Sequence, residues 1–148
     1  SGHQPLYFDN YAPIYDQYVV IGSKITVMYM PRSSTLHAIG GLIGDDDGTT
    51  PTTFDTLCES NNAISTVIAP AGGGITELEM TFEPQENFGV DAKSDGSAQT
   101  AVTTSPTEQW YWTVWHQPAD GASTQTCDVK VMIEYTVKYS ELKSQVQN

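Results

Sequence analysis

The sequence predicts an all-β protein, an antiparallel sandwich of the jelly-roll type with one or two short helices. Residues 128–139 read DVKVMIEYTVKY, and apolar and polar side chains alternate throughout this segment. Residues 18–30 alternate in the same way near the other end of the chain. Such alternation is typical of strands with one buried face and one wetter face. Short alternating segments separated by turn signals lie between them, as in sandwiches. We therefore expect the first and last strands to pair in one sheet.

The elements of the first half follow from local signals. Aromatic and apolar residues recur at three- and four-residue steps over residues 8–18. This spacing predicts a short helix, capped by Asp9 or Asn10 and with Pro13 in its first turn. The strand over 18–30 follows directly. Residues 36–44 read as a second strand, weakened by two glycines, and a brief helix is expected around residues 54–59.

The second half alternates strands with loops. Strands are predicted over 63–70 and 75–84, with Leu78, Met80 and Phe82 of the latter facing inward. Residues 87–90 (NFGV) read as a short strand or edge segment. The polar stretch 91–105 reads as a long surface loop. A strand over 110–118 carries aromatic residues on both faces, and the long strand over 128–139 closes the chain.

Length and charge limit the classes of function. The 148 residues are expected to form a single domain over 1–148, with enough apolar content for a core. There are 18 acidic and 6 basic residues, for a net charge of −12. Such a body repels nucleic acid and anionic membranes, and an acidic surface also keeps a β-rich protein in solution. No apolar stretch approaches the roughly 20 residues that cross a bilayer, so no membrane partner is expected.

The two cysteines, Cys58 and Cys127, do not define a disulfide scaffold. Cys127 opens the last strand and Cys58 lies in a predicted helical turn. Two buried free thiols are the expectation, and one disulfide in an oxidising compartment is the alternative.

The sequence lacks the patterns that carry enzyme chemistry or hold a cofactor. The run Asp45, Asp46, Asp47 offers oxygen ligands, but without the spacing of a calcium loop it reads as a solvated turn. The glutamates at 77, 79 and 83 are spaced so that two carboxylates could serve a glycosidase, but an exposed charged strand face is the favoured explanation. His3, His37 and His116 share no motif with a nucleophile. We expect no catalytic residue, no metal and no cofactor.

Three tryptophans over residues 110–115 leave several interpretations open. Trp110, Trp112 and Trp115 are consistent with core residues, with anchors of a subunit contact, or with a stacking platform for sugar rings. The last possibility makes a soluble carbohydrate-binding β-sandwich the alternative function.

Three stretches of the chain resemble the capsid proteins of small circular single-stranded DNA viruses, the circovirus-like group. They are HQPLYFDNYAPIYDQYVVIGSKITVMYM (residues 3–30), FEPQENFG (82–89) and PTEQWYWTVWHQPADG with DVKVMIEYTVKYSELK (within 106–143). The first is the most specific, because a leading HQP, an aromatic-rich F-D-x-Y-A-x-x-Y-x-x-Y segment and V-x-G-S-K-I-T-V occur in that order. The motifs cover roughly half of the chain.

The resemblance implies a single eight-stranded jelly roll whose copies form an icosahedral shell around a circular single-stranded genome. It implies no catalytic residue. The shell would be a virion, assembled inside the host cell, in the nucleus. Viral DNA would be bound mainly by a basic amino-terminal arm, which this sequence does not contain, since Arg32 is its sole arginine. Outer loops, such as residues 91–105, would meet a host receptor or glycan.

A shell subunit needs several contacts, each burying on the order of 1,600 Å². Aromatic residues in loops and helices are therefore the candidates for the homo-oligomer interface. They are Phe8, Tyr11, Tyr15, Phe54, Phe88 and Trp115. For Tyr11 and Tyr15, packing beneath the sandwich is an equal alternative, and for Trp115 the alternative is the core.

Overall fold

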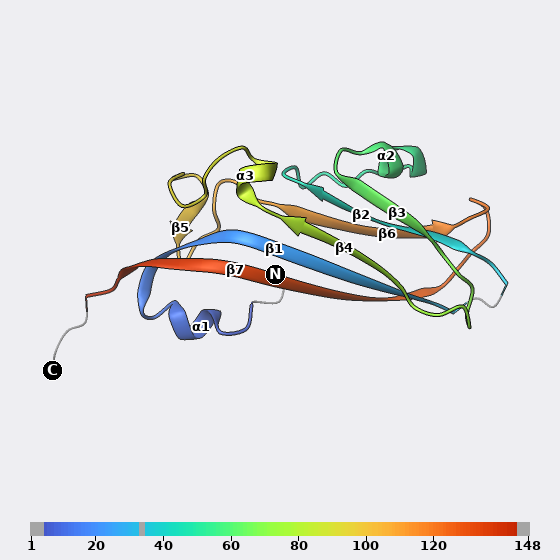
Figure 1. Cartoon of the computed structure of the whole chain (residues 1–148), viewed down its shortest axis with the longest axis horizontal. Coiled ribbons are helices and arrows are strands. Elements are labelled where there is room, and N and C mark those ends of the chain that lie inside the picture. Colours follow the sequence, from blue (N-terminus) through green and yellow to red (C-terminus); the bar gives the residue numbers. More distant parts are fainter. Residues whose placement is uncertain (1–4, 33–34, 145–148) are drawn as a thin grey trace. The chain divides into compact units, whose positions relative to one another are not determined.

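The structure is a computed structural model that describes residues 5–32 and 35–144, and the fold is all-β, as predicted (Figure 1). Seven strands and three short helices occur among the described residues. In chain order they are α1 (Phe8–Tyr11), β1 (Tyr15–Pro31), β2 (Ala38–Asp45), α2 (Phe54–Glu59), β3 (Ala63–Ile68), β4 (Thr76–Phe82), α3 (Pro84–Asn87), β5 (Gln99–Ala101), β6 (Tyr111–Pro118) and β7 (Cys127–Leu142).

The chain divides into two compact units. Unit 1 comprises Ser1–Ser23, Phe82–Gln109 and Tyr135–Asn148, and unit 2 comprises Lys24–Thr81 and Trp110–Glu134. Each unit therefore contains a part of β1 and a part of β7. The expectation of a single domain over 1–148 stays a prediction.

Unit 2 is a two-layer antiparallel sandwich. One sheet has the strand order β3-β2-β6. Its register places Ala38 opposite Ile68 on one side and opposite Pro118 on the other. In the second sheet β1 pairs with both β4 and β7, which lie on opposite sides of it in Figure 1. Buried residues of both sheets meet in one core: Ile25, Val27, Tyr29, Ala38, Leu42, Ile68 and Met80.

Glycines of β2 make room for the largest core side chains. A Cβ on Gly40 would lie 2.6 Å from Cδ1 of Ile68 and 3.0 Å from Cζ of Tyr29, and a Cβ on Gly41 would overlap the Trp115 indole. Tyr29 is fully buried, and its hydroxyl lies 2.8 Å from the Gly41 carbonyl oxygen and 3.1 Å from that of Trp115. Burial raises the pKa of the Tyr29 hydroxyl. The glycines that weaken the strand pattern of β2 are therefore required by the packing.

Unit 1 has a small core of its own. β5 pairs antiparallel with the start of β1, and Tyr18 lies opposite Thr100. Val19, Ala92 and Ala98 form a buried cluster against which Ile21 packs.

The first and last strands pair, as the sequence predicts. β7 hydrogen-bonds to β1 in both units, and the two ribbons, blue and red, run side by side in Figure 1. In unit 2 the Arg32 N–H donates to the Thr126 carbonyl, and in unit 1 the Lys143 N–H donates to the Ile14 carbonyl. Arg32 is also fixed by its side chain, which forms an ion pair with Asp128 at 2.6 Å. The chain ends are thus joined in one sheet.

Several predicted elements differ from the structure. The helix expected over 8–18 is only one turn, and β1 begins at Tyr15, so that Pro13 follows the helix. Its N-cap is Tyr7, which makes no side-chain cap hydrogen bond, and not Asp9 or Asn10. Strand pairing of the aromatic residues from Tyr15 onward overrides their helical spacing. His3, which opens the family-like stretch, lies outside the described residues.

The segment from 84 to 105 also differs from its prediction. The NFGV strand over 87–90 is absent, and the one-turn helix α3 ends at Asn87, the first residue of that segment. The stretch 91–105 contains β5 and the buried residues Ala92 and Ala98, so it is not entirely a surface loop. Ala92 and Ala98 are buried because they pack in one cluster with Val19 of β1. The described strands number seven, one fewer than the family resemblance implies.

Both cysteines are free, but the expectation of two buried thiols is wrong for Cys58. Cys58 lies on an exposed position of α2, whereas Cys127 is half-buried and packs against the core of unit 2. Burial raises the pKa of the Cys127 thiol.

Candidate functional site

The most unusual surface of the molecule is the unit 2 part of β7. From Val129 to Glu134 every residue is exposed, on both faces of the strand. Four of these residues are large and apolar: Val129, Val131, Met132 and Ile133. Val131 and Met132 are each 46% exposed although they lie on opposite faces. A strand that exposes apolar side chains on both faces marks a surface for protein contacts or for aggregation.

The apolar row of β7 that includes Val131 and Ile133 lies on the same side of its sheet as the core residues of β1. The alternation in the sequence therefore resembles that of a buried strand, although the row is exposed. The Arg32–Thr126 hydrogen bond defines an antiparallel register in which Val131 follows beside Val27, and Ile133 beside Ile25. The same register extends into unit 1, where a Cβ on Gly22 would lie 3.9 Å from Cβ of Thr136.

Val27 and Ile25 are buried because β2 and β3 cover them, but β7 lies at the edge of its sheet. Of β7, only Cys127 packs against this core. The expectation of a buried face for Val129, Val131, Ile133 and Tyr135 is therefore wrong, while their common direction holds.

The outer backbone edge of β7 is open as well. Among the described strands β7 pairs with β1 alone. Because Thr126 is hydrogen-bonded to β1, alternate residues from Thr126 onward direct their N–H and C=O groups toward β1. The residues between them, such as Val131 and Ile133, direct these groups to the open edge. An unpaired edge of this kind is a template for another strand.

A second surface, the aromatic groove, lies in unit 1 around Tyr139 of β7. The groove has a volume of about 660 Å³ and is lined mainly by aromatic and apolar side chains. The Tyr139 ring stacks on Tyr11 at 5.2 Å between centroids and approaches Phe8 at 6.2 Å and Tyr15 at 5.7 Å. Burial raises the pKa of the Tyr139 hydroxyl. Such a groove suits an apolar or amphipathic chain segment.

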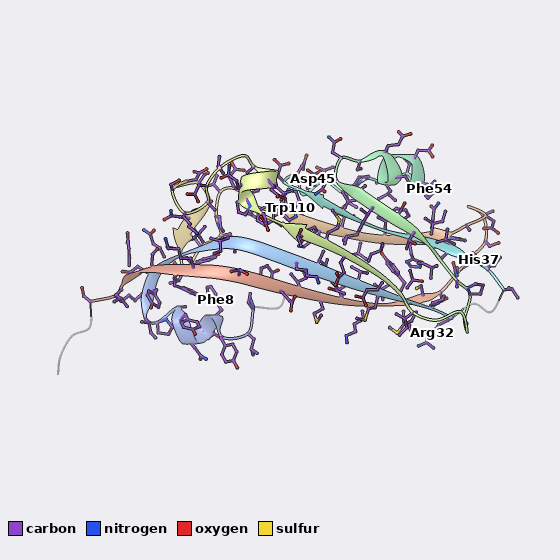
Figure 2. All side chains as sticks on the ribbon, in the orientation of Figure 1. Phe8, Arg32, His37, Asp45, Phe54 and Trp110 are labelled. Carbon is purple, nitrogen blue, oxygen red and sulfur yellow. The ribbon has the colours of Figure 1, made fainter. Side chains whose placement is uncertain are left out.

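The six interface candidates from the sequence are placed very differently by the structure. Phe8, Tyr11 and Tyr15 contact the Tyr139 ring of the aromatic groove, and of these only Tyr11 is exposed, at 47%. Phe8, labelled in Figure 2, comes from α1. Phe88 packs edge-on against Phe82 at 5.3 Å.

The remaining two candidates contact each other within unit 2. Phe54 of α2, also labelled in Figure 2, meets Trp115 edge-to-face at 5.9 Å. Trp115 is only 9% exposed and belongs to the interior of unit 2. Of the six candidates, Tyr11 alone presents a largely exposed ring, and use of the other five by a partner stays a prediction.

The three tryptophans lie in β6 and directly before it, and their rings differ in burial. Trp112 packs against the core of unit 2, and the ring of half-buried Trp110 meets it edge-on at 5.8 Å. Buried Trp115 and half-buried Trp112 match the core interpretation, while a role of these rings in sugar binding stays a prediction.

The acidic residues of β4 and the position after it include one carboxylate, that of Glu79, that is paired with a lysine. Leu78, Met80 and Phe82 face inward as predicted, and Glu77, Glu79 and Glu83 are exposed. The Lys24 ammonium lies 2.7 Å from Glu79 Oε1, and this hydrogen bond lowers the pKa of the Glu79 carboxyl. A glycosidase acid needs the opposite shift, since it must hold a proton near neutral pH. Glu79 is therefore not prepared for that role.

The Asp45–Asp47 turn uses its carboxylates locally. Asp45 accepts the Asp46 N–H at 2.9 Å, and Asp47 accepts the Thr49 N–H at 2.9 Å. Hydrogen bonds from Thr49 lower the pKa of the Asp47 carboxyl. Within residues 5–32 and 35–144, no group of three or more His, Cys, Asp or Glu side chains is arranged to hold a metal ion.

The surface on β7 was missed by sequence reasoning, because alternation reveals the direction of a side chain and not what covers it. One signal was present: Met132 interrupts the polar row between Lys130 and Glu134.

No helix in the described parts of the chain is both long and apolar enough to cross a membrane. No protein-family model and no curated protein matches this chain.

Proposed function

We propose that this chain is a structural capsid subunit that self-assembles into a small icosahedral shell, as its motif resemblance to circovirus-like capsid proteins implies. The observation that carries the proposal is the exposed unit 2 part of β7. Its apolar side chains are uncovered on both faces and its backbone edge is open. A stable soluble monomer rarely tolerates such a strand, whereas a subunit buries it against a neighbour.

The rest of the molecule is consistent with a structural role. The core is closed by buried aromatic and aliphatic residues, and the carboxylates of Glu79, Asp45 and Asp47 are engaged in local bonds. A sandwich with an open strand edge suits a shell subunit. We assign the chain no catalytic activity.

The net charge of −12 decides how a genome would be held. A strongly acidic body repels a phosphate backbone. The proposal therefore assigns the viral DNA to a basic arm outside these 148 residues, and host receptors or glycans to outer loops. Shells of the present chain should contain no nucleic acid. Their ratio of absorbance at 260 and 280 nm should be that of pure protein, and a ratio typical of nucleic acid would contradict the assignment.

Negative-stain microscopy and sedimentation velocity of the purified chain test the shell itself. Uniform small spheres are expected at high protein concentration, in at least one condition of a salt series. A monomer at all concentrations and salts would overturn the proposal.

Val131→Lys tests whether the exposed strand is a contact. A lysine on this apolar row should suppress the particles, because a buried contact cannot accept an unpaired charge. Ala122→Lys is the matched control, since it adds the same charge to an exposed turn of the same unit. Equal assembly of both variants would remove β7 from the interface.

A further inference from the structure

The open edge of β7 contains enough information to define its partner. We propose that β7 pairs antiparallel with β7 of a second copy of this chain, about a two-fold axis at Met132. The inference deepens the proposed function, on which it rests, by naming one subunit contact and its register. It depends on three features of the strand: the open edge, the separation of apolar and polar rows, and the positions of Lys130 and Glu134.

The first step is the row alternation. In an antiparallel pair, directly opposite residues lie on the same face of the sheet. A two-fold axis that passes through a residue brings odd-numbered residues opposite odd ones, so that the row of Val131 and Ile133 meets its own copy. An axis between two residues would place this apolar row opposite the polar row, and such a register is excluded.

The second step is charge complementarity. With the axis at Met132, Lys130 lies opposite Glu134 of the second copy, and the symmetry repeats this pair. Val131 lies opposite Ile133 of the second copy, also twice. Opposite charges in direct cross-strand positions stabilise a pair of strands, and like charges destabilise it.

Neighbouring registers match less well. An axis at Ile133 sets Asp128 opposite Lys138, but Asp128 already pairs with Arg32, and Glu134 would lie opposite Met132. An axis at Val131 places Glu134 opposite Asp128, and an axis at Glu134 places Lys130 opposite Lys138. An axis at Thr136 does bring Glu134 opposite Lys138, but it also sets apolar Val131 opposite the charged Glu141. The axis at Met132 satisfies charges and apolar residues together.

The third step is availability of the groups. Lys130, Met132 and Glu134 are all exposed in the described chain. The Lys24 ammonium, on the neighbouring strand β1, forms its ion pair with Glu79 at 2.7 Å, and Glu134 adds a weaker electrostatic attraction to the same ammonium. The backbone groups of Val131 and Ile133 point to the open edge. In the proposed register, Val131 exchanges both backbone hydrogen bonds with Ile133 of the second copy, and Ile133 does so with Val131. Met132 then faces its copy as a non-hydrogen-bonded pair.

Charge reversal with rescue tests the register. Lys130→Glu and Glu134→Lys should each weaken self-association by on the order of 10-fold or more, because two attractive pairs become repulsive. The double variant restores both pairs with reversed sign and should recover the wild-type dissociation constant in analytical ultracentrifugation. Circular dichroism checks that each variant is folded, which is expected since both side chains are exposed.

The competing outcomes are separable. If the axis were at Thr136, Lys130→Glu would have no effect and the double variant would remain weak. If neither single variant changed the association, the proposal would be wrong, even where particles form, because the shell would then use other contacts. A dimer that follows the rescue pattern but never forms particles would support the strand pairing and contradict the shell.

Disulfide trapping locates the axis directly. A non-hydrogen-bonded pair has Cα atoms about 4.5 Å apart, which a disulfide spans. In a background with Cys58→Ser and Cys127→Ser, Met132→Cys should give a covalent dimer on mild oxidation. Thr136→Cys, four residues along the same strand, should not. Cross-linking of Thr136→Cys in preference to Met132→Cys would overturn the register.

Discussion

At the scale of single residues, the fold depends on glycine meeting aromatic rings. Gly40 and Gly41 lie in the middle of β2, where a strand would ordinarily lose stability from their flexibility. Here they allow Tyr29 and Trp115 to approach the β2 backbone, and the Tyr29 hydroxyl donates to the Gly41 carbonyl of β2 and lies within reach of the Trp115 carbonyl of β6. The Tyr29 hydroxyl can therefore be buried with its hydrogen bonds only because residues 40 and 41 are glycines.

Gly41→Ala should destabilise the protein by about 1–3 kcal/mol, because its Cβ would overlap the rigid Trp115 indole in a packed interior. Urea unfolding followed by tryptophan fluorescence measures this change. Gly96→Ala is the matched control, since a Cβ at Gly96 would meet nothing within 4 Å. Equal stability of the two variants would contradict the packing described for β2.

Glu79 gives the protein a component of acid sensitivity. Its pKa is lowered by the hydrogen bond from Lys24, so its contribution to stability is present above the unfolded-state pKa of about 4.3. That contribution is lost as the pH falls through the lowered folded-state pKa. Glu79→Gln should therefore reduce the free energy of unfolding at pH 7, and the difference from wild type should shrink toward pH 3. Glu77→Gln, on the same strand, should give a weaker pH dependence, and an equal one would assign the effect to general charge.

At the scale of elements, α2 shows a segment whose local signals and structure agree. The sequence predicts a brief helix at 54–59, and the structure has α2 at those residues. Thr53 is the N-cap, and its side chain and that of Thr56 form a reciprocal capping box. Phe54, the first residue of the helix, covers the Trp115 ring. A short helix is thus held by its cap and by one aromatic contact.

Thr53→Ala should cost about 1 kcal/mol, the usual price of a lost N-cap. The accompanying loosening of α2 should expose Trp115 and shift its fluorescence to longer wavelength before global unfolding. Thr52→Ala alters a neighbouring exposed threonine and should leave both stability and fluorescence unchanged. If both variants behaved alike, the capping box would carry no stability.

The strands show what a sequence pattern can and cannot predict. Alternation located β1, β4 and β7 and the direction of their side chains, because period two is a property of the strand alone. It did not reveal that β7 lies at a sheet edge, since covering depends on partners distant in sequence. The same limit applies at Trp115, which is buried by α2. Position within the sheet, rather than local pattern, decided which candidate residues are exposed.

At the scale of the whole molecule, the net charge and the apolar surface of β7 have opposite effects on self-association. Each copy carries a net charge of −12, so copies repel over a distance set by the ionic strength. The proposed β7 contact is local, with apolar side chains and strand hydrogen bonds that salt does not screen. Association should therefore be limited by long-range repulsion at low salt.

Self-association of the 148-residue chain should strengthen as NaCl rises from 0.05 M to 0.5 M. The Debye length falls from roughly 14 Å to about 4 Å over this range, which removes most of the repulsion between the acidic bodies. The two Lys130–Glu134 pairs lose some strength at the same time, but exposed pairs contribute only about 0.2–1 kcal/mol each. Sedimentation velocity at matched protein concentration measures the balance. The charge-rescued double variant has the same net charge and should show the same salt dependence, whereas association that weakens steadily with salt would mean that ion pairs dominate the contact.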